Sequence, residues 1–137
     1  MDFDTVKPEV LGQSLTGIGV NLLCRDVLAT VAFLQDVFGL RAYRAGADFA
    51  IVTHGQMILQ LHSDGTYGAH PLLGVLPENP PRGAGVQIYL FGLDPDAAVA
   101  RAAPNQVLEP PADKPHGLRE ATILSPDGYA FSPARPL

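Results

Sequence analysis

Two stretches of the chain alternate apolar and polar residues and then run directly into a helical pattern. In the stretch 85–100, GVQIYLFGLDPDAAVA, every second residue from Val86 is apolar, whereas Gln87, Tyr89 and Phe91 fall on the opposite side of the predicted strand. Asp94 follows as a helix cap, and Pro95 suits the first position of a helix. The stretch predicts a strand that leads into a capped, Ala-rich helix.

The stretch 19–31 repeats this plan earlier in the chain. Seven positions separate Gly19 from Asp26, and the same number separates Gln87 from Asp94. An apolar stripe at three- and four-residue spacing then predicts a helix over 27–38, which Gly39 ends. The chain is therefore expected to contain two similar modules.

Three short strands are expected after each helix. In the first module they cover 41–44, 49–54 and 56–62, and in the second 106–108, 118–124 and 129–132, with a tight turn at 125–128. Residues 1–15 show no periodicity and are interpreted as an arm or an irregular lead-in strand. A single domain, 1–137, is predicted, with a first module at 16–62, a Pro/Gly-rich connection at 63–84 and a second module at 85–135. The connection is either a lid over a pocket or a packed linker or dimer contact.

Composition excludes several classes of function. Hydrophobic residues make up 47% of the 137 residues and the net charge is −5, so a folded core is expected and a nucleic-acid surface is not. Cys24, the single cysteine, excludes an internal disulfide and fits a reducing compartment. The acidic start does not resemble a secretory signal, and no apolar run is long enough to cross a membrane. We expect a cytoplasmic protein without a membrane partner.

The order of elements, with CRDVLATVAFLQDVFGL in the first module and HGLREATILSPDGYAF in the second, resembles the vicinal oxygen chelate superfamily, which includes glyoxalase I, extradiol dioxygenases and bleomycin-resistance proteins. The resemblance covers residues 16–135. It implies an α+β fold in which two βαβββ modules form a cupped, barrel-like mixed sheet with helices outside. It also implies a homodimer, because members are commonly dimers.

Metal-dependent members carry His, Glu or Gln at four strand positions that face the cup. By the resemblance, these positions hold Gly19, Gln60, Gln87 and Ser132 here. A glycine, two neutral amides and a hydroxyl are poor ligands for a divalent transition metal. No metal and no cofactor are therefore expected, and the character is closest to the metal-free bleomycin-resistance-like branch.

Strand alternation places polar and aromatic residues on the cup side, where a buried polar group needs a hydrogen-bond partner. His62 is either a general base or hydrogen-bond donor to a ligand, or a histidine at the rim. His116, Arg119 and Glu120 either close over a ligand, with Arg119 pairing an anionic group, or belong to a solvated loop with a local Arg–Glu pair. A metal site of His62, His116 and Glu120 is a further alternative without matched spacing. Catalytic residues are not assigned. The predicted ligand-binding residues are Asn21, Gln60, His62, Gln87, Tyr89, Phe91, His116, Arg119 and Ser132.

These observations predict a protein that binds a small polar or aromatic molecule, an antibiotic or a metabolite, in a cup-shaped cavity without a metal. The alternative is an enzyme of the same superfamily, either a divalent-metal-dependent lyase or dioxygenase with an off-pattern site, or a metal-free isomerase that uses His62.

Overall fold

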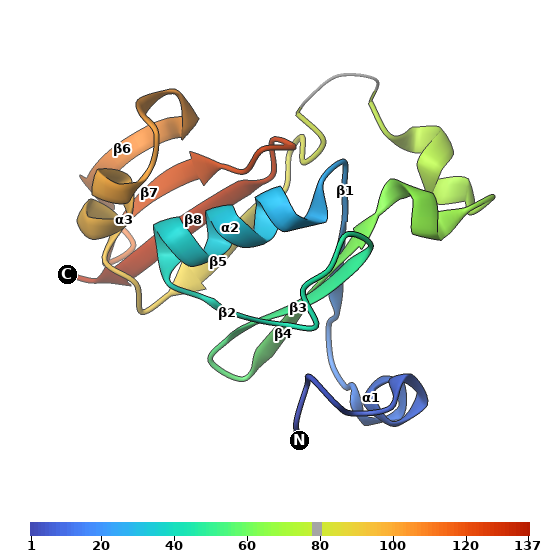
Figure 1. The fold of residues 1–137 in the computed structure, drawn as a ribbon. Coiled ribbons are helices and arrows are strands. Elements are labelled where there is room, and N and C mark those ends of the chain that lie inside the picture. The colour runs from blue at the N-terminus through green and yellow to red at the C-terminus, as the bar shows by residue number, and fades with distance from the viewer. Residues whose placement is uncertain (78–80) are drawn as a thin grey trace.

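Two four-stranded mixed sheets, each built from a strand, a helix and three further strands, make up the protein (Figure 1). The structure is a computed structural model that describes residues 1–77 and 81–137. The first sheet has the strand order β1-β4-β3-β2 and the second β5-β8-β7-β6, and the described residues do not close into a barrel. The first module consists of β1 (Val20–Cys24), α2 (Val27–Phe38), β2 (Arg41–Tyr43), β3 (Phe49–His54) and β4 (Met57–Ser63). The second consists of β5 (Gln87–Phe91), α3 (Pro95–Arg101), β6 (Val107–Asp113), β7 (Leu118–Leu124) and β8 (Ala130–Pro136).

Both strand–helix units form as the local pattern predicts. The Asp26 side chain accepts a hydrogen bond of 3.0 Å from the backbone N–H of Ala29, and Gly39 ends α2 in the left-handed region at φ 69°. In the second unit Asp94 accepts from the N–H of Asp96, and Pro95 begins α3. None of the helices in the described part of the chain has the length and apolar character that a bilayer crossing requires.

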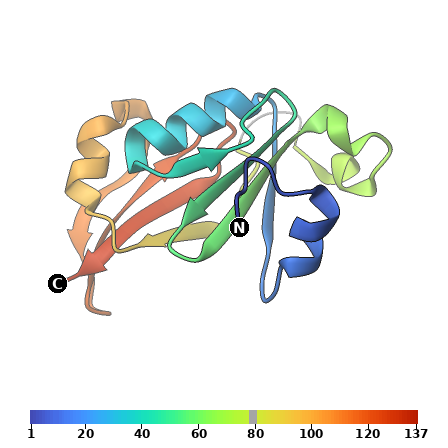
Figure 2. The ribbon, with the colours of Figure 1, turned by 60° about the horizontal axis from the view of Figure 1, so that its bottom comes forward.

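The two sheets share one apolar core on their helix sides. Leu22 and Leu61 of the first sheet and Leu90 of the second belong to the same buried cluster as the inner face of α2. The Phe131 ring on β8 lies 6.1 Å and 5.9 Å from the rings of Phe33 and Phe38 on α2. Figure 2 shows α2 and α3 together on one side of the sheets. Because α2 packs on both sheets, their helix sides are turned toward each other and their cup sides are turned outward.

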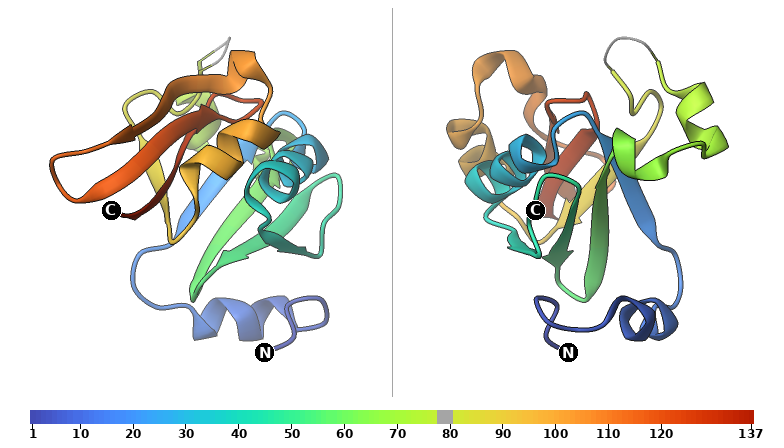
Figure 3. Two further views of the ribbon diagram at one scale, coloured as in Figure 1. Left: turned by 90° about the vertical axis from the view of Figure 1, so that its left-hand side faces the viewer. Right: turned by 45° about the vertical axis from the view of Figure 1, so that its right-hand side comes forward.

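A short helix replaces the arm or lead-in strand expected at the N-terminus. This helix, α1 (Pro8–Ser14), begins at a proline and buries Leu11. Arg44 holds the segment before it, since its guanidinium donates to the backbone carbonyls of Asp4 and Val6. Figure 3 shows α1 apart from α2 and α3. The prediction failed because one buried leucine in two turns leaves no periodic signal.

Two strands extend further than the sequence predicts. The strand expected at 106–108 continues as β6 through Pro110 and Pro111, and the final strand continues past Pro133. β6 is an edge strand whose pairing with β7 shifts register twice, and such positions tolerate residues without an N–H donor.

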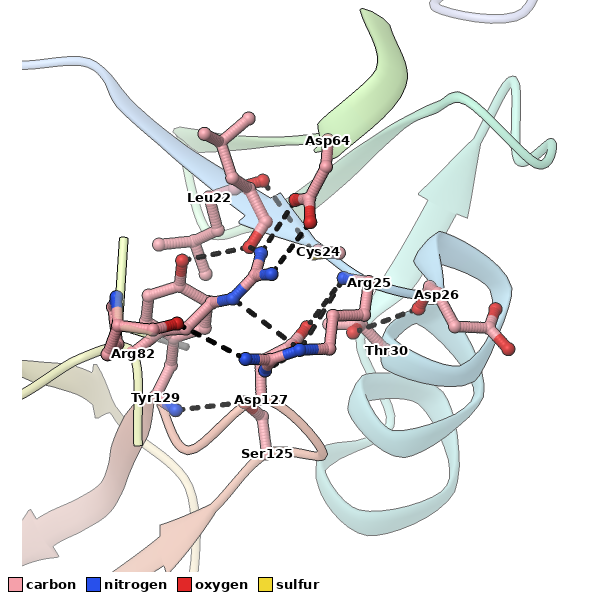
Figure 4. A network of polar contacts seen from close by, with 12 residues as sticks. Leu22, Cys24, Arg25, Asp26, Thr30, Asp64, Arg82, Ser125, Asp127 and Tyr129 are labelled. Carbon is pink, nitrogen blue, oxygen red and sulfur yellow. Dashed lines mark hydrogen bonds and ion pairs between the residues drawn. The ribbon is translucent and has the colours of Figure 1, made fainter. Parts of the chain in front are cut away.

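The connection between the modules is clamped at its base. It holds two 3-10 turns, η1 (Asp64–Tyr67) and η2 (Pro71–Val75), while residues 78–80 of the predicted 63–84 segment lie outside the described residues. Arg82 donates to both carboxylate oxygens of Asp64, at 2.6 and 2.7 Å, and to the Leu23 carbonyl at 3.1 Å (Figure 4). Its backbone N–H also donates to the Asp127 carbonyl at 2.8 Å. These contacts join the connection to β1 and to the turn before β8.

Cys24 is expected to be inert to thiol reagents while the protein is folded. Its side chain is fully buried, and desolvation raises the pKa of the thiol to about 11. We expect a colorimetric disulfide reagent to modify native protein at least about 100-fold more slowly than protein in denaturant, because reaction requires local opening. Equal rates in the two conditions would contradict this placement.

Candidate functional site

A row of mutually hydrogen-bonded neutral groups crosses the cup side of the second sheet. The Gln87 amide nitrogen donates to the Ser132 hydroxyl at 2.9 Å, and that hydroxyl lies 2.9 Å from the hydroxyl of Thr122. Strand pairing brings them together, because β8 lies between β5 and β7. A hollow of about 460 Å³ lies over this face and is lined by Gln87, Thr122 and the exposed Leu108. The site therefore offers hydrogen-bonding groups without charge beside apolar surface.

A second group on the same face contains a buried carboxylate. Tyr89 donates to Glu120 at 3.3 Å, and the His116 ring nitrogen lies 3.2 Å from the other carboxylate oxygen. Desolvation and then the Glu120 charge raise the pKa of Tyr89. The Phe91 ring stacks on Tyr89 at 5.1 Å, nearly parallel. The structure thus brings Tyr89, Phe91 and His116 together as a wall, and it places Glu120 with them.

The cup side of the first sheet carries its own hydrogen-bonded group. The His62 Nδ1 lies 2.5 Å from the Asn21 side-chain oxygen, and the Asn21 amide nitrogen donates to the Tyr67 hydroxyl at 2.5 Å. Burial lowers the pKa of His62, so the ring is neutral at physiological pH. Tyr67 comes from η1 in the connection, and no strand or helix pattern marked it.

Arg119 does not lie with these groups. Its guanidinium pairs with Asp96 of α3, at 2.7 and 2.8 Å, and with Asp113, at 3.0 Å. Alternation along β7 explains the placement, because Arg119 and Glu120 are neighbours and point to opposite faces. The structure therefore places Arg119 on the helix side and Glu120 on the cup side, unlike the ligand contact expected for the arginine.

The two halves of the predicted cup lie apart within one chain. Among the described residues, the hollow that holds Gln60 and His62 contains no residue of the second module, and the one that holds Gln87 and Thr122 contains none of the first. The shared core lies between these two hollows, and a third hollow of about 370 Å³ is lined by residues of both modules, Met57 and Phe91 among them. One chain therefore presents two half-sites.

The residues at the four metal positions do not fit a divalent transition metal. Gly19 has no side chain to offer, and Gln60 and Gln87 offer neutral amides. The Ser132 hydroxyl is already hydrogen-bonded to two neighbours. The described part of the chain contains no group of three or more His, Cys, Asp or Glu side chains placed to hold an ion. In particular, His62 lies on the first sheet, away from His116 and Glu120 on the second, so these three do not form the alternative site.

No family model and no curated protein matches the chain by sequence. Solved structures do match its fold. A glyoxalase/bleomycin resistance protein/dioxygenase family enzyme from Burkholderia phytofirmans superposes with a TM-score of 0.67 at 20% identity, over 86% of this chain and 96% of the other. A glyoxalase-related enzyme from Fulvimarina pelagi gives 0.69 at 18% identity, over 88% of both chains. A glyoxalase/bleomycin resistance protein/dioxygenase from Nocardioides gives 0.64 at 21% identity, over 94% and 91%. The chain has the paired βαβββ fold of the vicinal oxygen chelate superfamily.

Proposed function

We propose that this protein binds a small polar or aromatic organic molecule, an antibiotic or a metabolite, between its cup-side faces without a divalent metal. The observation that carries the proposal is the row Gln87–Ser132–Thr122. Gln87 and Ser132 occupy positions that hold metal ligands in metal-dependent proteins of this fold, yet the whole row consists of neutral donors and acceptors. Such groups orient an organic ligand through hydrogen bonds, and the Tyr89–Phe91 stack supplies aromatic surface beside them.

A second copy of the chain completes the cup. Each half-site has large apolar side chains exposed at its rim, Ile18 at 81% on the first half and Phe91 at 60% and Leu108 at 65% on the second. In a twofold-symmetric dimer the first half of one copy covers the second half of the other, which buries both rims and forms two equivalent cups. The proposed partner is therefore a homodimer mate, and the ligand contacts both copies.

Replacing Gln87 with alanine is expected to weaken ligand binding about tenfold and to leave the fold intact. The amide lies at the surface and contributes about one hydrogen bond, roughly 1–1.5 kcal/mol. A thermal-shift screen of antibiotics, keto acids and aromatic metabolites, with and without divalent metals, would identify a ligand. Calorimetry would then compare the wild type with Gln87→Ala and with a control, Gln35→Ala, at an exposed position of α2.

Two results would count against the proposal. One is a screen in which nothing in this range stabilises the protein. The other is purified protein that holds near-stoichiometric metal whose removal by a chelator abolishes an activity, because this would favour the lyase or dioxygenase alternative. Unchanged affinity in Gln87→Ala, with the folded fraction reduced, would make Gln87 a structural residue.

A further inference from the structure

A hollow of about 420 Å³ lies between α1 and the cup side of the first sheet. Leu11 of α1 and Leu15, which follows the helix, form one wall, and Phe49, Gln60 and His62 of the sheet form the other. The wall from α1 is anchored, because Arg44 ties the preceding segment to the sheet and the Phe3 ring packs edge-on against Tyr43 at 5.4 Å. The hollow is therefore a built feature of one chain, with apolar sides and two polar side chains.

The hydrogen bonds of His62 determine which of its ring nitrogens is free. The Asn21 amide nitrogen donates to Tyr67, so the Asn21 oxygen faces His62 and accepts from Nδ1. In a neutral imidazole, a proton on Nδ1 leaves a lone pair on Nε2. The imidazole packs against the rings of Phe49, at 4.8 Å, and Tyr67, at 5.5 Å. Nε2 has no hydrogen-bond partner among the residues that the structure describes.

Gln60 offers the complementary group. It stands two residues before His62 on the same face of β4, so the two side chains emerge about 7 Å apart. Within the described residues its amide makes no hydrogen bond, whereas Asn21, Ser132 and Thr122 on the cup sides are all engaged. A lone pair and an unpartnered amide N–H thus lie beside an apolar hollow. A hydroxyl group satisfies both, because it donates through its hydrogen and accepts through its oxygen.

We propose that this hollow binds an uncharged hydroxyl compound with a small apolar body, whose O–H donates to His62 Nε2 and whose oxygen accepts from Gln60. The proposal rests on the small-molecule function above and names the ligand chemistry of the first half-site. Arg44 also lines the hollow, where its Nε and one Nη donate to the backbone carbonyls of Asp4 and Val6, so the guanidinium is held toward the N-terminal segment. The backbone N–H of Arg44 donates to the Asp4 carboxylate at 2.9 Å. A carboxylate ligand would in addition face the Nε2 lone pair, which repels it.

The test compares two probes that differ in one donor hydrogen, 4-methylphenol and 4-methylanisole, with the full-length protein. In titrations followed by amide NMR, 4-methylphenol is expected to bind at least about tenfold more tightly than 4-methylanisole. The amide resonances of α1 and β4 are expected to change their chemical shifts on binding. The His62 ring nitrogens are expected to show the Nδ1–H form in free protein, and the Nε2 resonance is expected to move on binding. His62→Phe keeps the ring packing and should remove the preference, whereas His54→Phe, outside the hollow, should keep it.

Several outcomes would overturn the inference. Equal affinity for the two probes, an unchanged preference in His62→Phe, or a His62 ring with its proton on Nε2 would each do so. If 4-methylbenzoate binds more tightly than 4-methylphenol, the hollow is an anion site and the proposed hydroxyl site is wrong. If neither 4-methylphenol nor 4-methylanisole binds, while a compound from the screen binds and Gln87→Ala weakens that binding, this inference is wrong and the proposed function is supported. If nothing binds, both fall.

Discussion

Replacing Arg82 with alanine is expected to lower the free energy of unfolding by about 3–5 kcal/mol, the range for breaking a buried charge network. The Arg82 side chain is only 4% exposed. It donates to both oxygens of Asp64 and to the Leu23 carbonyl, and its Nε lies 4.0 Å from the equally buried Asp127 carboxylate. The substitution removes all of these contacts at once. Among the described residues, the buried Asp127 carboxylate then keeps one cationic partner, the partly exposed Arg25 guanidinium at 3.0 Å.

The expected effect is large because the network links parts of the chain that are distant in sequence. Asp64 begins the connection and Arg82 stands near its end, so their ion pair closes the segment at its base. The Leu23 carbonyl also accepts from the Tyr129 hydroxyl at 2.9 Å, which ties β1 to the start of β8 (Figure 4). The same contacts therefore stabilise both the connection and the joint between the modules.

Urea unfolding would measure the change, with Arg135→Ala as the matched control. Arg135 is 42% exposed and lies 3.7 Å from Asp94, so its loss should cost less than about 1 kcal/mol. The Arg82 effect should also shrink in acid. The hydrogen bond from Arg82 lowers the pKa of Asp64 below the usual 3.8, so this stabilisation is present above that value and is lost as the pH falls through the lower folded value. A loss below 1 kcal/mol in Arg82→Ala at neutral pH would show that the network does not hold the modules together.

The sequence predicts the strand–helix units well because their determinants are local. Asp26 and Gly39 act on the ends of α2 through groups within four residues, and the alternation around Leu22 and Leu90 needs only one buried face. The network of Arg82 has no such signal. Its partner Asp64 is 18 residues away in the sequence. From the sequence alone, an isolated arginine in a Pro/Gly-rich segment is expected to be solvated, because the ion pair with Asp64 exists only in the folded chain.

The candidate site is predicted only in part for a related reason. Alternation correctly places Gln87 and Ser132 on one face, and along β7 the same alternation separates Arg119 from Glu120. Nor does alternation decide how two sheets face each other. The same pattern fits a cup closed within one chain and a cup closed between two. The contact of Phe131 with α2, together with the core that both sheets share, shows that the cup sides of one chain point apart.

The shared cup leads to the second large expected effect, which is rescue by mixing. Gln60→Ala damages the first half-site and Gln87→Ala the second, so each variant alone should bind a compound identified in the screen about tenfold more weakly. In a mixed dimer one cup combines both damaged halves, and the other combines the two intact halves. Random exchange of subunits should therefore restore wild-type affinity in about one quarter of all cups.

A second mixture provides the control, and the mass of the protein provides an independent check. Gln87→Ala mixed with Ser132→Ala should show no rescue, because both substitutions damage the second half and every cup in the mixed dimer then carries one damaged half. Light scattering should give twice the chain mass of 14.5 kDa, and Leu108→Glu, which places a charge at the exposed rim, should shift the protein toward the single-chain mass. A dimer without rescue would mean that the ligand contacts one copy only. A single-chain mass for the wild-type protein would contradict the shared cup. Any ligand would then bind to one half-site alone, as proposed for the hollow beneath α1.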